Sequence, residues 1–209
     1  MYDVINDLGL EIAQDIIIKV MGVGGGGCNA VNYMYSQGIK DVSFLVCNTD
    51  KQALNRSSIS AKLQLGPGLG AGGRPEVGEK AAEESRVAIS DAIKDADLVF
   101  ITAGMGGGTG TGAAPVIAKI AQEMKILTVA VVTLPFNFQA KRRMDNALAG
   151  IDALRKSVDS IITIPNDKIS QVVPKGTSFP DALKVADEVL RQGIRGIAEL
   201  IVNPSLINL

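Results

Sequence analysis

The sequence contains no histidine and no tryptophan, and it has only two cysteines, Cys28 and Cys47, among 209 residues. Without histidine, both a histidine-based catalytic triad and a histidine-ligated metal site are excluded. Cys28 follows a run of glycines and Cys47 ends an apolar run. This placement does not indicate a disulfide framework, and we interpret Cys28 as a small loop residue.

Long apolar runs are also missing, although 46% of the residues are hydrophobic. Charges or glycines interrupt every run well short of the roughly 18 residues that a membrane span needs. Residues 1–15 are acidic and lack the basic start and apolar centre of a signal peptide, so we interpret them as a partly helical N-terminal arm. The net charge of -1 does not favour a nucleic-acid partner. We expect a cytoplasmic protein with no direct membrane contact.

Glycine, in contrast, is abundant, and six of the nine residues in 104–112 are glycines. This stretch follows an apolar run, 98–103, that predicts a buried strand, and it precedes residues 113–120, which predict a helix. Glycines allow backbone N–H groups to approach a ligand, and the start of the helix adds its positive dipole end. No lysine or arginine lies in the stretch. The pattern therefore predicts an anion site of backbone donors, which suits a phosphate chain.

A second glycine stretch, residues 22–27, lies between a predicted strand (16–23) and a predicted helix (29–37). It fits the G-x-G-x-x-G pattern of dinucleotide sites, with Asp50 after the next predicted strand, 42–47. In a doubly wound sheet the first and fourth strands are neighbours, so the two glycine stretches would hold one phosphate chain from both sides. An NAD site needs only the first stretch, and the Walker A pattern of ordinary P-loop enzymes is absent.

The order of elements predicts an α/β fold with a doubly wound, mostly parallel sheet. Further predicted elements are a helix over 75–94, a strand over 126–133, a helix over 139–156 and a strand over 158–164. We assign residues 16–178 to a nucleotide-binding domain and 179–203 to a long central helix. Apolar residues cover more than one face of this helix, which predicts packing against a second domain outside this sequence.

Four segments together closely resemble FtsZ, the bacterial branch of the tubulin-like division GTPases: residues 24–32, 48–50, 68–72 and above all 104–112. Residues 135–138, 164–167 and 186–190 continue the resemblance. It implies a Rossmann-like GTPase domain that binds GTP and GDP, with Mg²⁺ held through phosphates and water and no metal ligands of its own. It also implies head-to-tail filaments at the division site. Division proteins and membrane anchors would bind C-terminal regions outside this sequence.

The resemblance implies the following roles in the nucleotide site. Residues 24–29 would hold the α- and β-phosphates, residues 107–110 would hold the β- and γ-phosphates, and Ala71 and Gly72 would sense the γ-phosphate. Arg143 would lie near the phosphates and ribose, and Asn166 with Asp187 would read guanine. The complete set is Gly25, Gly26, Gly27, Cys28, Asn29, Asn48, Ala71, Gly72, Gly104, Gly106, Gly107, Gly108, Thr109, Gly110, Pro135, Gln139, Arg143, Asn166, Leu183 and Asp187.

Several positions depart from the family pattern. Gln139 replaces a carboxylate that contacts ribose, Leu183 replaces a phenylalanine that stacks on the base, and the segment before Gly68 is shortened. The family completes hydrolysis with an Asn-x-Asp-x-x-Asp loop from the next subunit. Asn208 would begin that loop, and the sequence ends before its aspartates. We therefore expect a chain that binds guanine nucleotides but hydrolyses GTP weakly or not at all.

Two alternatives remain open. A degenerate domain of the same family could modulate the filaments of a complete partner without hydrolysis. The departures from the family pattern would fit this alternative. An NAD-dependent oxidoreductase would use the first glycine stretch and Asp50, but it would leave the second stretch, Asn166 and Asp187 without a role.

Overall fold

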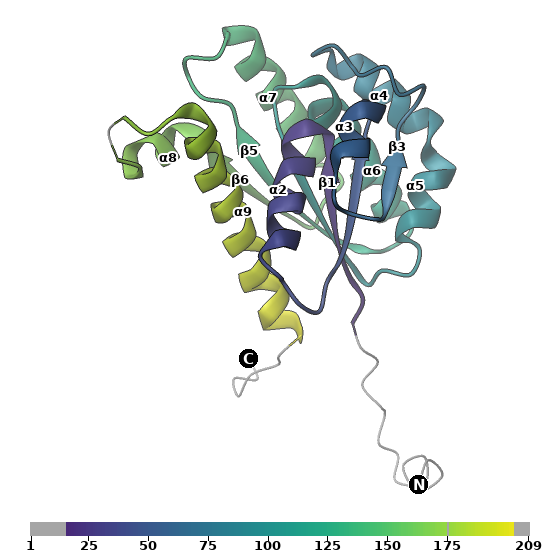
Figure 1. Cartoon of the computed structure of the whole chain (residues 1–209). Helices are drawn as coiled ribbons and strands as arrows, with labels where there is room; N and C mark the ends of the chain where they lie inside the picture. Colours follow the sequence, from purple (N-terminus) through teal and green to yellow (C-terminus); the bar gives the residue numbers. More distant parts are fainter. Residues whose placement is uncertain (1–15, 175, 203–209) are drawn as a thin grey trace, which may run out of the picture.

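A computed structural model describes residues 16–174 and 176–202. Its centre is a six-stranded sheet in the order β3-β2-β1-β4-β5-β6, in which every neighbouring pair is parallel (Figure 1). The strands are β1 (Ile18–Val23), β2 (Ser43–Asn48), β3 (Lys62–Gln64), β4 (Leu98–Gly104), β5 (Leu127–Leu134) and β6 (Ser160–Pro165). The predicted doubly wound α/β fold is confirmed, with the winding direction reversing between β1 and β4.

Helices cover both faces of this sheet, because alternate strand residues point to opposite sides. The helices are α2 (Gly24–Ser36), α3 (Lys51–Arg56), α4 (Pro75–Glu84), α5 (Arg86–Ile93), α6 (Gly108–Glu123), α7 (Lys141–Leu154), α8 (Asn166–Val172) and α9 (Phe179–Val202). One buried cluster joins the sheet to α4, α5, α6 and α7. A second cluster, on the other face, joins it to α2, α3 and α9. Burial of the central strands on both sides explains why β1, apart from Lys19, and β4 are predominantly apolar.

Several predicted boundaries were wrong. The single helix over 75–94 is two helices, α4 and α5, interrupted at Ser85, whose φ of -101° and ψ of 11° leave the helical region. α2 begins at Gly24 rather than 29, and α7 spans 141–154 rather than 139–156. β3, α3 and α8 were not predicted, since each has seven or fewer residues and no clear periodicity.

The long helix α9 packs through one stripe. Among the side chains that the structure describes, its buried residues are Ala182, Ala186, Leu190, Ile194 and Ala198, at a spacing of four. The apolar residues beside this stripe, among them Val185, Val189 and Ile197, are half-buried. Packing of a second domain on α9 remains a proposal. Among the described residues, no helix is both long and apolar enough to span a membrane.

Candidate functional site

The site lies where β1 and β4 run side by side. Val23, the last residue of β1, pairs with Ala103 near the end of β4, so the two glycine stretches leave the same edge of the sheet together. They touch through their backbones: a Cβ added to Gly24 would lie 2.8 Å from the nitrogen of Gly110. A Cβ added to Gly26 would lie 3.2 Å from the Cα of Gly104. Side chains at these positions would force the two loops apart.

Both glycine stretches run directly into helices. α2 begins at Gly24 and α6 begins at Gly108, so each stretch supplies the first helical turn that follows it. Neither helix has a side-chain cap or an acidic residue in its first turn. Their initial N–H groups and dipole ends therefore remain available to an anion. Gly25 and Gly107 have no atom within 4 Å of the position that a Cβ would take, which leaves open space in front of both loops.

The two loops line one cavity of about 380 Å³. Thirteen residues of the predicted site line it: Gly25, Gly26, Asn29, Gly104, Gly107, Gly108, Thr109, Gly110, Pro135, Gln139, Arg143, Asn166 and Leu183. Met105, Thr133 and Phe179 line it as well and were not predicted. Thr133 lies near the carboxyl end of β5, beside the end of β4, and this position in a parallel sheet was the signal that could have found it.

Asn166 is one of the residues that line the cavity. It begins α8 directly after β6, and its side chain is only 6% exposed. Its Oδ1 accepts no hydrogen bond from any residue of the described chain. A buried acceptor without a partner costs free energy, so Asn166 is suited to accept a hydrogen bond from a ligand in this cavity.

An aromatic cluster borders the cavity. Phe179, the first residue of α9, is 45% exposed and lines the cavity together with Leu183. Its ring centre lies 5.6 Å from that of Phe136 and 5.8 Å from that of Phe138. The cavity wall thus includes both an apolar surface and the free acceptor of Asn166, a combination that can hold a flat polar ring.

The other predicted site residues lie around the cavity rather than in its wall. Gly27 packs beneath it, where an added Cβ would lie 2.2 Å from the carbonyl oxygen of Thr102. Cys28 is buried, and its Sγ contacts the carbonyl oxygens of Gly22 and Cys47 at 3.6 Å and 3.5 Å. Burial raises the pKa of the Cys28 thiol to about 12, so the thiol stays neutral.

Three further residues support the loops from outside the cavity wall. Asn48 is buried and accepts a hydrogen bond from the backbone of Asp50 at 3.3 Å. Ala71 is buried against Gly108, where an added Cβ would lie 2.7 Å from its own. Gly106 has a φ of +95° and lies against the backbone of Arg143, which brings the start of α7 to the glycine loop. Gly72 and Gly106 line a neighbouring cavity.

Asp187 lies one turn beyond Leu183 on α9 and is half-buried, but it does not line the cavity. Burial raises the pKa of its carboxyl to about 7. An aspartate with such a pKa changes charge near neutral pH, a property typical of functional sites. Any ligand that needs the ionised carboxylate would have to favour its deprotonation.

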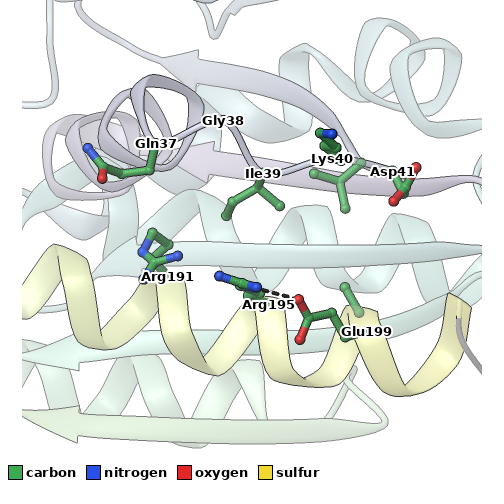
Figure 2. Close-up of a pocket in the computed structure, with 10 residues that line it drawn as sticks. Gln37, Gly38, Ile39, Lys40, Asp41, Arg191, Arg195 and Glu199 are labelled. Atoms are coloured by element: carbon green, nitrogen blue, oxygen red, sulfur yellow. Dashed lines mark hydrogen bonds and ion pairs between the residues drawn. The ribbon is translucent and has the colours of Figure 1, made fainter. Parts of the chain in front are cut away.

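A separate cavity, of about 320 Å³, lies between the segment that joins α2 to β2 and the second half of α9 (Figure 2). Its two arginines are paired with glutamates: Arg195 contacts Glu199 at 2.6 Å, and Arg191 contacts Glu188 at 2.6 Å. It contains no residue of the two glycine stretches.

Comparison with known proteins agrees with this geometry. Residues 17–174 match the model of the family described as Tubulin/FtsZ family, GTPase domain. An empty dimer of FtsZ from M. jannaschii is 44% identical, with a TM-score of 0.88. This comparison covers 100% of the chain described here and 61% of the FtsZ chain. A point mutant of FtsZ from the same organism is 43% identical, with a TM-score of 0.88 and coverage of 100% and 64%.

A more distant similarity extends to CetZ2 from Haloferax volcanii, solved as a GTPγS-bound protofilament. Its identity is 21% and its TM-score is 0.81, over 92% of the present chain and 60% of the CetZ2 chain. At this identity the similarity shows a shared fold. The present chain therefore spans about three fifths of the length of these relatives.

Proposed function

The chain belongs to the tubulin/FtsZ family, as part of its GTPase domain, and from this premise we propose that the cavity between the two glycine stretches binds GTP and GDP. One observation carries the proposal: the backbones of Gly24 and Gly110 are in contact at the junction of β1 and β4, with two uncapped helix starts facing one cavity. Backbone N–H groups from two sides suit a chain of phosphates better than a single anion.

Within this cavity the phosphates would lie along the glycine stretches and the base would lie at the Asn166 end. We assign the α- and β-phosphates to the start of α2 and the β- and γ-phosphates to the start of α6. Arg143 would contact the phosphates and ribose, and Gln139 would donate a hydrogen bond to the ribose. Ala71 and Gly72 would respond to the γ-phosphate from the segment before α4.

Base selectivity would come from two acceptors. Guanine carries the N1–H and 2-amino donors, and adenine offers neither of these. The unpartnered Oδ1 of Asn166 would accept one hydrogen bond, and the Asp187 carboxylate would accept from N1–H and the 2-amino group once the ligand brings it into contact. A site built around acceptors discriminates strongly against a base without donors, because its buried acceptors are then left unpaired.

Hydrolysis of GTP requires an oriented water molecule and stabilisation of charge on the γ-phosphate. No aspartate or glutamate of the described chain lines the cavity. We propose that the water-orienting carboxylates come from a second copy of the complete protein, and that the present chain alone turns over slowly. Asn208, which we assign to the start of that contributing loop, lies outside the described residues.

The described residues contain no cluster of three or more side chains that could hold a metal ion. Mg²⁺ would therefore be held by phosphate oxygens and water, and its charge would neutralise the phosphates. The residues that face it would be the glycine stretches themselves.

Self-association is the natural setting for such a divided site. The similar FtsZ structure is a dimer, and the similar CetZ2 structure is a protofilament. We propose that the complete protein forms head-to-tail filaments through the face that carries the nucleotide, and that these act in cytoplasmic cell division. Partners that join the filament to the membrane would bind outside the present sequence.

The first test is equilibrium binding of a fluorescent GTP analogue to the purified chain, with GDP, ATP and NAD as competitors. We expect displacement by GDP but not by ATP or NAD. Displacement by NAD would instead support a dinucleotide site. A chain that is folded by circular dichroism but binds no nucleotide would support the degenerate filament modulator.

The rate of GTP turnover tests whether hydrolysis depends on a second copy of the protein. Phosphate release from the chain alone should be slow, because no carboxylate of the described residues lines the cavity. Steady multiple turnover at low protein concentration would show that hydrolysis does not depend on a second copy.

A further inference from the structure

A second cavity, of about 450 Å³, adjoins the nucleotide cavity and shares Gly107 and Arg143 with it. Its wall comes from three separate segments: the residues before α4, the glycine stretch after β4, and the start of α7. The contact between Gly106 and the backbone of Arg143 holds the second and third of these together. The floor of this cavity is therefore fixed by the same glycines that shape the nucleotide site.

Three arginines line this second cavity: Arg74, Arg142 and Arg143. No aspartate or glutamate lines it, although Glu76 and Asp145 lie within three residues of these arginines in sequence. Within the described chain, none of the three guanidinium groups makes an ion pair or a hydrogen bond to another residue. The cavity in Figure 2 is different, because its arginines are paired with glutamates. Positive charge is thus concentrated here without any internal counter-charge.

The start of α7 adds to this concentration. Its first three residues are Lys141, Arg142 and Arg143, and no acidic residue lies in its first turn. Ala140 precedes the helix and provides no side-chain cap. Cations at a helix N-terminus oppose the helix dipole and destabilise the unliganded helix. An unfavourable arrangement of charges that the fold itself does not offset is characteristic of binding sites. Here a bound anion would offset the cations at the start of α7.

We propose that this arginine cavity binds a phosphate dianion beside the nucleotide, in a position to receive the orthophosphate that hydrolysis releases. Arginine favours phosphate because its planar fork of N–H donors matches two oxygens at once. The shared wall at Gly107 and Arg143 places the anion next to the end of the phosphate chain. The identity of the anion rests on the charges described here, and its origin from GTP rests on the proposed function.

The test is calorimetric titration of orthophosphate into the GDP-saturated chain, with chloride added to hold the ionic strength constant. The test variant combines Arg74→Gln with Arg142→Gln, neither of which we place in the nucleotide site. Arg155→Gln, at the opposite end of α7, makes the control for a lost surface charge. We expect phosphate affinity to fall at least about fivefold in the double variant and to stay within about twofold in the control.

Two results would overturn the proposal. Equal phosphate affinity in the double variant and the unmodified chain would show that the glycine stretches alone hold the anion. No measurable phosphate binding to the unmodified GDP-loaded chain, up to tens of millimolar, would show that there is no such site. A double variant with Arg74→Lys and Arg142→Lys keeps the charge and should retain intermediate affinity, which protects the test from a folding defect.

A failure of the proposed function can be distinguished from a failure of this proposal. If the unmodified chain binds no GDP, orthophosphate is titrated into the nucleotide-free chain instead. The dependence of phosphate affinity on Arg74 and Arg142 then decides whether the arginine cavity binds an anion, whatever the fate of the nucleotide site.

Discussion

The hydroxyl of Thr49 lies 2.7 Å from the hydroxyl of Thr109, and both side chains are buried. Thr49 follows β2, and Thr109 lies in the first turn of α6. This hydrogen bond therefore connects the end of the second strand to the glycine stretch after the fourth, across the junction where the site lies. It helps to fix the position of the glycine stretch that we propose binds phosphate.

Replacement of Thr49 by valine should destabilise the chain, because the Thr109 hydroxyl would lose its buried partner. We expect the free energy of unfolding to fall by about 1–3 kcal/mol. Urea denaturation measures this loss. Thr163→Val makes the matched control, since Thr163 is exposed on β6 and should change stability little. Equal stability of the two variants would show that the hydrogen bond contributes nothing.

Alanine at Gly25 should weaken nucleotide binding, whereas alanine at Gly27 should lower stability. Gly25 has open space where a Cβ would lie, whereas Gly27 would place one 2.2 Å from the carbonyl oxygen of Thr102. Gly25→Ala should therefore fold normally but project a methyl group toward the phosphates and weaken GTP binding by about tenfold or more. Gly27→Ala should lower the thermal unfolding midpoint sharply. Thermal unfolding and nucleotide titration of both variants separate the two effects, and a stable Gly27→Ala chain would contradict this geometry.

Replacement of Asn166 by leucine should weaken GTP binding without lowering the stability of the nucleotide-free protein. The buried Oδ1 has no partner in the described chain, so its removal should leave the nucleotide-free protein equally stable or more stable. The affinity for GTP should fall by about tenfold, since a buried hydrogen bond to the ligand is worth about 1–2 kcal/mol. The comparison needs denaturation without nucleotide and titration with GTP. A large loss of stability together with unchanged affinity would assign Asn166 a structural role instead.

The carboxyl of Asp187 should make both stability and binding depend on pH. Its pKa is raised by burial to about 7, well above its value in an unfolded chain. The folded state therefore holds this proton more tightly, so the group stabilises the fold at low pH. That contribution declines as pH rises from about 4 to about 7. Asp187→Asn should flatten this part of the stability profile, measured as the difference between the two chains.

Binding should show the opposite trend, because in the proposed role of Asp187 only the ionised carboxylate accepts both hydrogen bonds from guanine. GTP affinity should rise between about pH 6 and 8, and binding should release a proton. Calorimetry in buffers of different ionisation enthalpy detects that release. No proton release, or an unchanged pH profile in Asp187→Asn, would remove Asp187 from the base-reading role.

Phe179 should contribute more to nucleotide affinity than Phe138. Both rings belong to the same aromatic cluster, but only Phe179 lines the cavity, whereas Phe138 is 73% exposed. We expect Phe179→Ala to weaken GTP binding by about fivefold, equivalent to the loss of about 1 kcal/mol of stacking. Tripolyphosphate has no base, so its affinity should not change. A greater loss in Phe138→Ala than in Phe179→Ala would reverse this assignment.

The local patterns of the sequence determined much of the fold. Apolar runs correctly predicted the five longer strands, and the doubly wound fold predicted that the strands before the two glycine stretches, β1 and β4, are neighbours. Motif residues around 104–112 also predicted the family. The strands and helix starts could be predicted because they depend on contacts between residues that are close in sequence, whereas the pairing of β1 with β4 followed from the general rule for doubly wound sheets.

Only the tertiary structure decided the rest. β3 and α8 are too short to have a period of their own, and they form through contact with β2 and β6. Thr133 and Phe179 reach the cavity because the parallel sheet brings the end of β5 and the start of α9 to the glycine stretches. The three unpaired arginines are separated by up to 69 positions, from Arg74 to Arg143, and chain folding alone gathers them into one cavity. Local sequence cannot specify such a site, because its charges interact only through space.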